Sequence, residues 1–322
     1  MMNEHFVLEI QEQEYFEEGI FRVLDKLHLD AAKFISAKTQ QHHNIHELRT
    51  NLKKIRGILR LLRHEIGEDS YQLMNSHYKN LAAEVAVLRD DTSQIELLQE
   101  IKNRIKNTAV KKDLGKIIAQ HDEARKQAFY LFNQSGNAEN LKQMILGLQQ
   151  MMHELSLTGN PELFILKSLK HIYRQARSAF EITGLLNDEE LYHYWRKQVK
   201  YLMYHLMLLN KAWPNSIRVF INDLGRLASK LGELHDLNLF HTGIKEKRIY
   251  CSAKTQQSYL LRFVYKRRWQ LKKHIHHLGE QYFTESSDAF AMRIFNSWEN
   301  SVMSKKTIKN RKNADGSCNC TY

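Results

Sequence analysis

The chain of 322 residues is 43% hydrophobic, which is enough for one large domain or two ordinary ones around a sizeable core. Its 48 Lys and Arg against 36 Asp and Glu give a formal net charge of +12, which favours an acidic partner such as nucleic acid, an anionic membrane surface or another polyanion. Two prolines and 13 glycines supply too few turn signals for an all-β protein, and no uninterrupted apolar run is long enough to suggest a membrane span.

Along the chain, apolar residues recur at helical spacing without sustained period-two alternation, which predicts an all-α protein. The acidic stretch 1–19 lacks the basic-then-apolar plan of a signal peptide, and 3 cysteines are too few for a disulfide framework or a four-ligand zinc site. We therefore expect a cytoplasmic protein. Helices are predicted near 6–27, 29–39, 44–66, 71–88, 92–107, 111–133, 138–155, 162–183, 188–210, 215–234, 237–247, 253–284 and 287–302.

The predicted helix 44–66 carries two stripes, about 110° apart at helical periodicity. The apolar stripe consists of Leu48, Leu52, Ile55, Leu59, Leu62 and Ile66. The basic stripe consists of His46, Arg49, Lys53, Arg56, Arg60 and Arg63. A row of cations without interleaved acids is costly, so it fits the wall of a groove that binds a polyanion. It also fits a solvated face whose aliphatic stems cover apolar neighbours.

Two motifs of this region recur later in the chain. HELRTNLKKIRG (46–57) matches HYWRKQVKYLMY (193–204), and LAAEVAVLRDD (81–91) matches LASKLGELHDL (227–237) at an offset one residue shorter. Two motifs at nearly one offset predict an internal duplication. The matched polar residues are His46 and His193, Arg49 and Arg196, Lys53 and Lys200, Arg89 and His235, and Asp90 and Asp236.

Two further segments are rich in cations. The stretch 166–180 is predicted to form a third regular basic stripe, with Lys167, Lys170, Arg174 and Arg177. The stretch 261–277 is less regular, has aromatic residues between its cations, and fits a solvated face better. Its cations are Arg262, Lys266, Arg267, Arg268, Lys272 and Lys273.

The motifs H-x-x-R-x-x-x-K-x-x-R at 46–56 and H-x-x-R-K-x-x-K-Y at 193–201, with the endings LRD and LGELHDL, resemble the CHAD domain, the conserved-histidine α-helical domain, over about 5–302. The resemblance implies two four-helix-bundle-like halves related by a pseudo-two-fold axis. It also implies a basic groove or pore between them that binds inorganic polyphosphate, without catalysis, metal or cofactor. We predict a first repeat at 1–157, a second at 158–303 and a basic, disordered tail at 304–322.

Carried over by position, the resemblance and the stripes together predict twelve binding residues. They are His46, Arg49, Lys53, Arg56, Arg60, Lys170, Arg174, Arg177, His193, Arg196, Lys197 and Lys200. Asp90 and Asp236 are expected to orient a cation rather than act as catalytic acids. Met203 stands where the second motif usually has an arginine, so the first half is expected to supply more charge. The implied partners are polyphosphate granules or polyphosphate-metabolising enzymes.

The chemistry of such rows suits polyphosphate, a chain of closely spaced anions without bases. Arginine offers a planar fork for two phosphate oxygens and lysine a mobile point charge. A histidine beside the row can donate a hydrogen bond to the ligand. It can equally be structural, bonded to a carboxylate such as Asp90 or Asp236, so the role of His46 and His193 stays open. Storage, granule targeting and regulation of an enzyme remain alternatives for the biological role.

Three rival functions compete with polyphosphate binding. A nucleic-acid-binding helical protein fits the charge, but no zinc finger, RNP motif or helix-turn-helix signature is found. A metal site at His42 and His46 lacks a third ligand at a diagnostic spacing. A metal-dependent phosphate-processing enzyme would explain Glu12 and Glu14, which resemble an E-x-E element, but Phe16 stands where a lysine is expected. No membrane partner is expected, and nucleic acid is disfavoured.

Overall fold

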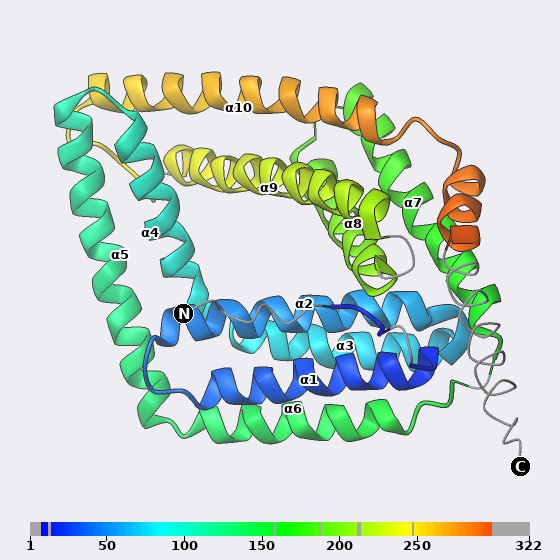
Figure 1. The fold of residues 1–322 in the computed structure, drawn as a ribbon. Helices are drawn as coiled ribbons and strands as arrows, with labels where there is room; N and C mark the ends of the chain where they lie inside the picture. The colour runs from blue at the N-terminus through cyan, green and yellow to red at the C-terminus, as the bar shows by residue number, and fades with distance from the viewer. Residues whose placement is uncertain are drawn as a thin grey trace, which may run out of the picture.

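A computed structural model describes residues 8–11, 14–157, 159–186, 188–210, 214–246 and 248–297. Within these ranges the chain is helical and contains no strand, which confirms the predicted all-α class (Figure 1). None of the helices in the described ranges has the length and apolar content needed to cross a bilayer. The helices are α1 (Phe16–Ser36), α2 (Gln41–Ile66), α3 (Glu68–Glu84), α4 (Val87–Arg104), α5 (Thr108–Gln134), α6 (Asn137–His153), α7 (Pro161–Leu185), α8 (Glu189–Leu208), α9 (Pro214–Lys245), α10 (Lys254–Tyr282) and a last segment at 287–297.

The first helix differs from the prediction, because α1 is one helix where the sequence suggests two, at 6–27 and 29–39. His28, at the expected break, is buried inside α1 and bonded on both ring nitrogens. Its Nδ1 donates to the carbonyl of Leu24 at 2.7 Å, and its Nε2 lies 2.6 Å from the hydroxyl of Tyr78 on α3. A tertiary partner therefore replaces the solvent that would favour a break here.

A second merger occurs in α9, where the sequence predicts a break between 234 and 237. The polar residues near this point have partners outside the helix. Asn238 is buried, and its Oδ1 accepts from Arg268 Nε on α10 at 2.7 Å. His235 packs on the ring of His193, with the ring centroids 4.3 Å apart. Asn238 is thus hydrogen-bonded to α10 and His235 is stacked on α8, and the helix continues through both residues.

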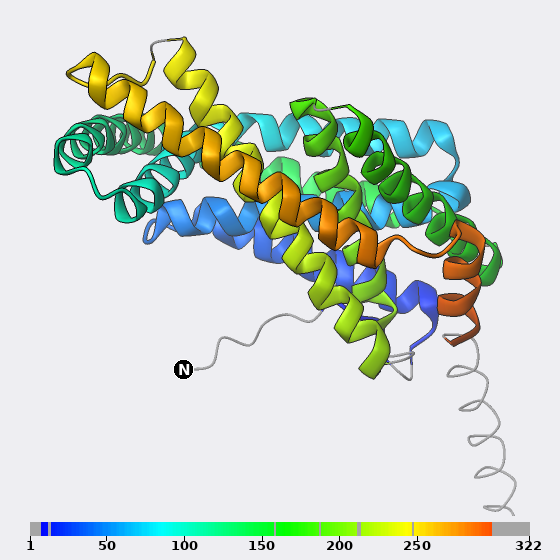
Figure 2. The ribbon, with the colours of Figure 1, turned by 90° about the horizontal axis from the view of Figure 1, so that it is seen from above.

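The helix α2 is central, since it contacts α1, α3, α4, α7 and α8. Figure 1 shows α1, α2, α3 and α6 running side by side along the lower edge, with the α4–α5 pair rising at one end. At the upper edge α9 packs on α10, and Figure 2 shows α10 crossing the molecule in front of α9. The helix α8 lies between α7 and α9 and also reaches α2.

The crossing of α2 and α8 is close because α2 has a glycine there. An added Cβ on Gly57 would lie 2.8 Å from Cδ2 of Tyr204, whose side chain is buried. Next to it, His205 Nε2 donates to the carbonyl of Gly57 at 2.9 Å. This contact brings α8, with its basic residues, against the middle of the basic stripe of α2.

Candidate anion-binding site

Five cations from three helices gather beside the α2–α8 crossing. Lys53 of α2 experiences repulsion from Lys200 and Arg196 of α8, from Arg49 of α2 and from Arg89 of α4. Lys200 is in turn repelled by Arg196 and by Lys54. We use the name cation cluster for Arg49, Lys53, Arg89, Arg196 and Lys200.

The two lysines of the cation cluster carry an unfavourable charge in the free protein. Loss of hydration, followed by repulsion from Lys200 and the arginines, lowers the pKa of Lys53 to about 7. Loss of hydration and repulsion from Arg196 lower the pKa of Lys200 to about 8. Lys53 nevertheless remains open to water.

Neither lysine has an anionic partner among the described residues, since Lys53 and Lys200 form no ion pair or hydrogen bond there. The only described neighbour that attracts Lys200 is the Tyr204 ring, whose centroid lies 5.8 Å from Nζ. Two lysine charges that have no counter-ion of their own are electrostatically costly beside three arginines. A bound anion would remove this cost.

The arginines of the cation cluster are partly fixed by the protein. Arg49 Nη1 donates to the carbonyl of Ala82 at 3.0 Å. Arg89 donates through both terminal nitrogens to Glu96, at 3.1 and 2.7 Å. Arg196 lies against the backbone of Gly232, where a Cβ would come within 3.2 Å of its Nε, and this buried Nε has no described partner. Two arginines are thus anchored while Arg196 keeps unused donor capacity.

Asp90 and Asp236 each lie near one arginine of the cation cluster. The charge of Asp90 opposes the lowering of the pKa of Arg49, which burial causes. Burial raises the pKa of Asp236, and the nearby Arg196 opposes this rise. No direct hydrogen bond joins either aspartate to its arginine in the described residues. The predicted role of Asp90 and Asp236 in orienting a cation therefore rests on electrostatic attraction to Arg49 and Arg196.

The two motif histidines occupy different environments. His193 packs on the ring of His235, and burial with repulsion from His235 lowers the pKa of His193 to about 4. Its Nδ1 is buried without a described partner. His46 is exposed at the edge of the site, where loss of hydration and Arg89 lower its pKa. No hydrogen bond links either histidine to a carboxylate in the described residues, so both are neutral potential donors near neutral pH.

From Arg56 onward, the basic stripe of α2 is engaged in packing. Arg56 Nε donates to Asn75 Oδ1 at 3.0 Å. The guanidinium of Arg60 lies 4.0 Å from the centroid of the Tyr201 ring, and its Nη1 donates to the carbonyl of Arg56 at 3.0 Å. Arg63 pairs with Glu68 at 2.6 and 2.9 Å. The stripe therefore has an unpaired end near Lys53 and a structural end that ties α2 to α3 and α8.

The predicted binding residues of α7 are not among the charges that act on Lys53 or Lys200. Lys170 forms an ion pair with Asp288. Arg177 pairs with Glu181 and donates to the carbonyl of Glu285 at 2.7 Å. Arg174 is exposed, as is Lys197 of α8, whose charge acts on His193. The structure thus brings together only four of the twelve predicted residues, with the two histidines nearby.

Sequence reasoning missed two contributors. Arg89 lies directly before Asp90 in the LRD motif, so that motif could have indicated Arg89 as a site residue. Lys54 lies on a different face of α2 from the basic stripe, and its charge nevertheless acts on Lys200. No sequence pattern indicates this contact, because it depends on where α8 crosses α2.

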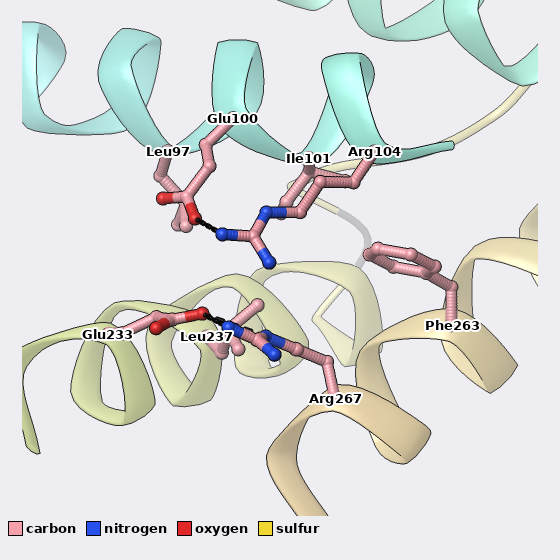
Figure 3. A pocket seen from close by; sticks show the side chains of 8 residues that line it. All are labelled: Leu97, Glu100, Ile101, Arg104, Glu233, Leu237, Phe263 and Arg267. Carbon is pink, nitrogen blue, oxygen red and sulfur yellow. Dashed lines mark hydrogen bonds and ion pairs between the residues drawn. The ribbon is translucent and has the colours of Figure 1, made fainter. Parts of the chain in front are cut away.

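Two hollows lie apart from the cation cluster. The one in Figure 3, between α4, α9 and α10, has a cavity volume of about 10 Å³, which is about one water molecule. Its charges pair internally, Arg104 with Glu100 and Arg267 with Glu233. A larger hollow of about 500 Å³ lies between α4 and α5. Across the described ranges no three His, Cys, Asp or Glu side chains are placed to hold a metal ion, and Glu12 lies outside those ranges.

The fold and the cation cluster define an all-α protein with a candidate site for an anion. Residues 23–243 match the family model of the CHAD domain, so the chain belongs to the CHAD domain family. This confirms the resemblance seen in the motifs. The match ends before α10, so the extension of the resemblance to about residue 302 stays a prediction. No match to the chain is found among curated proteins.

Proposed function

We propose that this protein is a non-catalytic module that binds inorganic polyphosphate at the cation cluster. The observation that carries the proposal is the pair Lys53 and Lys200. Two helices hold these lysines close enough to repel each other, in a site with three arginines, and neither has an anionic partner in the described residues. Membership of the CHAD domain family supports the same ligand.

The electrostatics of the cation cluster favour a chain of anions over a single ion. Arg89 is paired with Glu96, but the other four cations, from α2 and α8, still offer more positive charge than one phosphate group can neutralise. The free donors differ in kind, because the buried Nε of Arg196 lacks a partner while the lysine ammonium groups can rotate. A flexible polymer with a charge on every phosphate can satisfy several of them at once.

Nucleic acid is the weaker candidate for this site. Unstacked bases are bound mainly by aromatic rings that are open to solvent. The tyrosines beside the cation cluster, Tyr201 and Tyr204, are buried at 8% and 3% exposure. The cluster therefore offers phosphate-binding groups, while its neighbouring tyrosine rings are inaccessible to bases. A polymer that consists only of phosphate matches this chemistry.

We place the site between two repeats, 1–157 and 158–303, which arose by internal duplication and are related by a pseudo-two-fold axis. The matched pairs support this arrangement, because Arg49 is near Asp90 as Arg196 is near Asp236. Arg49, Lys53 and Arg89 come from the first repeat, so it supplies more of the charge. The predicted tail 304–322 lies outside the described residues.

A binding role rather than a catalytic one is proposed because the carboxylates near the cation cluster, Glu96, Asp90 and Asp236, interact with its arginines. Asp90 and Asp236 are thereby suited to hold Arg49 and Arg196 in place. Through the bound polymer the protein would associate with polyphosphate granules or with enzymes that make or degrade polyphosphate.

Titration of the purified protein with long-chain polyphosphate, short-chain polyphosphate and duplex DNA, each at two salt concentrations, tests the proposal. Binding should strengthen with polyphosphate length and weaken steeply with salt, because each neutralised phosphate releases counter-ions. Duplex DNA of equal charge should compete poorly. If it competed as well as long-chain polyphosphate, a polyphosphate-selective site would be ruled out.

A further inference from the structure

The outer face of α10 carries a row of cations and aromatic rings that the cation cluster does not explain. Residues 254–279 of this helix contain no acidic residue. The face consists of Arg262, Tyr265, Lys266, Trp269 and Lys273, whose spacing places them on one side of a helix. We use the name α10 strip for these five residues.

The α10 strip points away from the core. Leu260, Val264 and Leu271 are buried on the opposite side of the helix. On the strip itself, the side chains of Tyr265 and Trp269 are 69% and 61% exposed. Figure 1 shows α10 along the upper edge of the molecule, and in Figure 2, which views the molecule from that side, α10 lies in front of α9.

The cations of α10 divide into a paired inner set and an unpaired outer set. On the inner side, Arg267 pairs with Glu233, and Arg268 pairs with Glu189. On the outer side, Arg262, Lys266 and Lys273 form no ion pair or hydrogen bond with any described residue. The ammonium group of Lys273 lies 5.9 Å from the centroid of the Trp269 ring. Structural ion pairing therefore accounts for the inner cations and leaves the strip unexplained.

We propose that the α10 strip binds single-stranded nucleic acid, at a site separate from the cation cluster. Trp269 and Tyr265 are one helical turn apart, about 6 Å along the axis, and each presents a ring for stacking on an unpaired base. Arg262, Lys266 and Lys273 flank the rings and supply the charge that attracts the phosphate backbone. Aromatic platforms with neighbouring cations are the features that bind single strands without sequence preference.

The composition of the strip favours this ligand over an anionic membrane. A helix that inserts into a bilayer surface needs a broad apolar face with leucine or phenylalanine in addition to tryptophan. The buried leucines of α10 face the core and are not available to a bilayer. The exposed rings of the strip lie among cations instead of other apolar side chains. A duplex is also a poorer match, because its stacked bases are closed to Tyr265 and Trp269.

The test uses the full chain and a fluorescent oligothymidylate of about 20 nucleotides, with binding followed by anisotropy. One variant removes the rings and keeps the charge, Tyr265→Ala with Trp269→Ala. A second removes the charge and keeps the rings, Arg262→Gln, Lys266→Gln and Lys273→Gln. The matched control removes three positive charges elsewhere on the surface, Lys106→Gln, Lys112→Gln and Lys116→Gln, and circular dichroism checks that each variant is folded.

We expect the ring variant to bind the oligonucleotide at least about 10-fold more weakly, since it loses two stacking contacts and each contributes a factor of about 5 or more. The charge variant should lose more affinity than its control, and polyphosphate binding should change less than about 2-fold in both α10 variants. Oligothymidylate should quench part of the tryptophan fluorescence of the wild-type protein. This quenching should be absent in Trp269→Phe. The proposal is overturned if the ring variant binds the oligonucleotide like the wild type, or if a duplex binds the wild type as well as the oligonucleotide does. It is also overturned if the rings are needed for binding to vesicles that contain phosphatidylserine and not for binding to the oligonucleotide.

These experiments test polyphosphate binding at the cation cluster and oligonucleotide binding at the α10 strip separately. Loss of polyphosphate binding in a cation-cluster variant, with oligonucleotide binding retained, concerns the proposed function alone. Loss of oligonucleotide binding in the ring variant, with polyphosphate binding retained, concerns the α10 strip alone.

Discussion

Gly57 of α2 lies in direct contact with Tyr204 of α8, so close that an added Cβ would stand 2.8 Å from Cδ2 of the ring. Tyr204 is buried and cannot swing away, and His205 beside it is bonded to the carbonyl of Gly57. This contact sets the distance between the two helices that carry Lys53 and Lys200. The absence of a side chain at Gly57 therefore allows the close crossing that brings the two lysines together.

Gly57→Ala should destabilise the protein by about 1–2 kcal/mol, because overpacking at the crossing outweighs the gain in helix propensity. Gly147→Ala is the matched control, since Gly147 lies inside α6 and an added Cβ would meet nothing within 4 Å. That variant should gain about 0.5–1 kcal/mol. Denaturant unfolding of both variants measures the difference. Equal stabilisation by the two substitutions would show that the crossing is not tightly packed.

Polyphosphate binding should be accompanied by proton uptake. In the free protein the pKa of Lys53 is lowered to about 7 and that of Lys200 to about 8, so both lysines are largely neutral at about pH 9. A bound polyanion favours their charged forms. Affinity should therefore rise as the pH falls from about 9 to about 6.5. Calorimetry near pH 8 in two buffers of different ionisation enthalpy measures the uptake, and proton release would contradict the assignment.

The same lysines should destabilise the free protein. Their pKa values in the folded state are below the ordinary lysine value of 10.5, so above about pH 7 the unfolded chain binds more protons. Stability should therefore increase as the pH rises from about 7 towards 10. Lys53→Gln with Lys200→Gln should raise the melting temperature at about pH 6.5 while weakening polyphosphate binding. A lower melting temperature in this variant would mean that the lysines are paired in the native state.

Arg60 should matter for stability more than for binding, although the stripe pattern places it in the predicted site. Its guanidinium lies 4.0 Å from the Tyr201 ring centroid and is hydrogen-bonded to α2 itself. Arg60→Leu should cost about 1 kcal/mol of stability through the lost cation–π contact. Polyphosphate affinity should fall by less than about 3-fold. A larger loss of affinity, with stability unchanged, would extend the site past the α2–α8 crossing.

The sequence predicts the helical class because helical periodicity is a local property, and its motif spacing points to four residues that the structure brings together. Tertiary contacts are not local and cannot be predicted in this way. The sequence predicts helix breaks near 28 and between 234 and 237, yet both helices are continuous, and His28 and Asn238 bond to other helices at or near these points. Lys170 and Arg177 match the pattern of a binding stripe, but ion pairs and a carbonyl from 285–288 occupy them.

The adjacency of Lys53 and Lys200 could be expected only in general terms from the repeat. The motifs indicate which residue types recur, but not that α8 crosses α2 at Gly57 or that Lys54 and Arg89 lie near the same lysines. The crossing depends on the absence of one side chain, and a glycine in a helical pattern can equally mark the end of a helix. The electrostatic state of the site therefore becomes visible only in the structure.

The most direct test of polyphosphate binding at the cation cluster is the affinity of long-chain polyphosphate for Arg49→Ala with Arg196→Ala, compared with a chain that lacks 304–322. Each arginine should contribute a charge-assisted contact of about 1.5–3 kcal/mol, so the double variant should bind at least about 100-fold more weakly. Lys112→Gln with Lys116→Gln, which also removes two charges, should change affinity by less than about 3-fold. If removal of 304–322 abolished binding and the arginine variant retained it, the site would lie in the C-terminal segment and the central claim would be wrong.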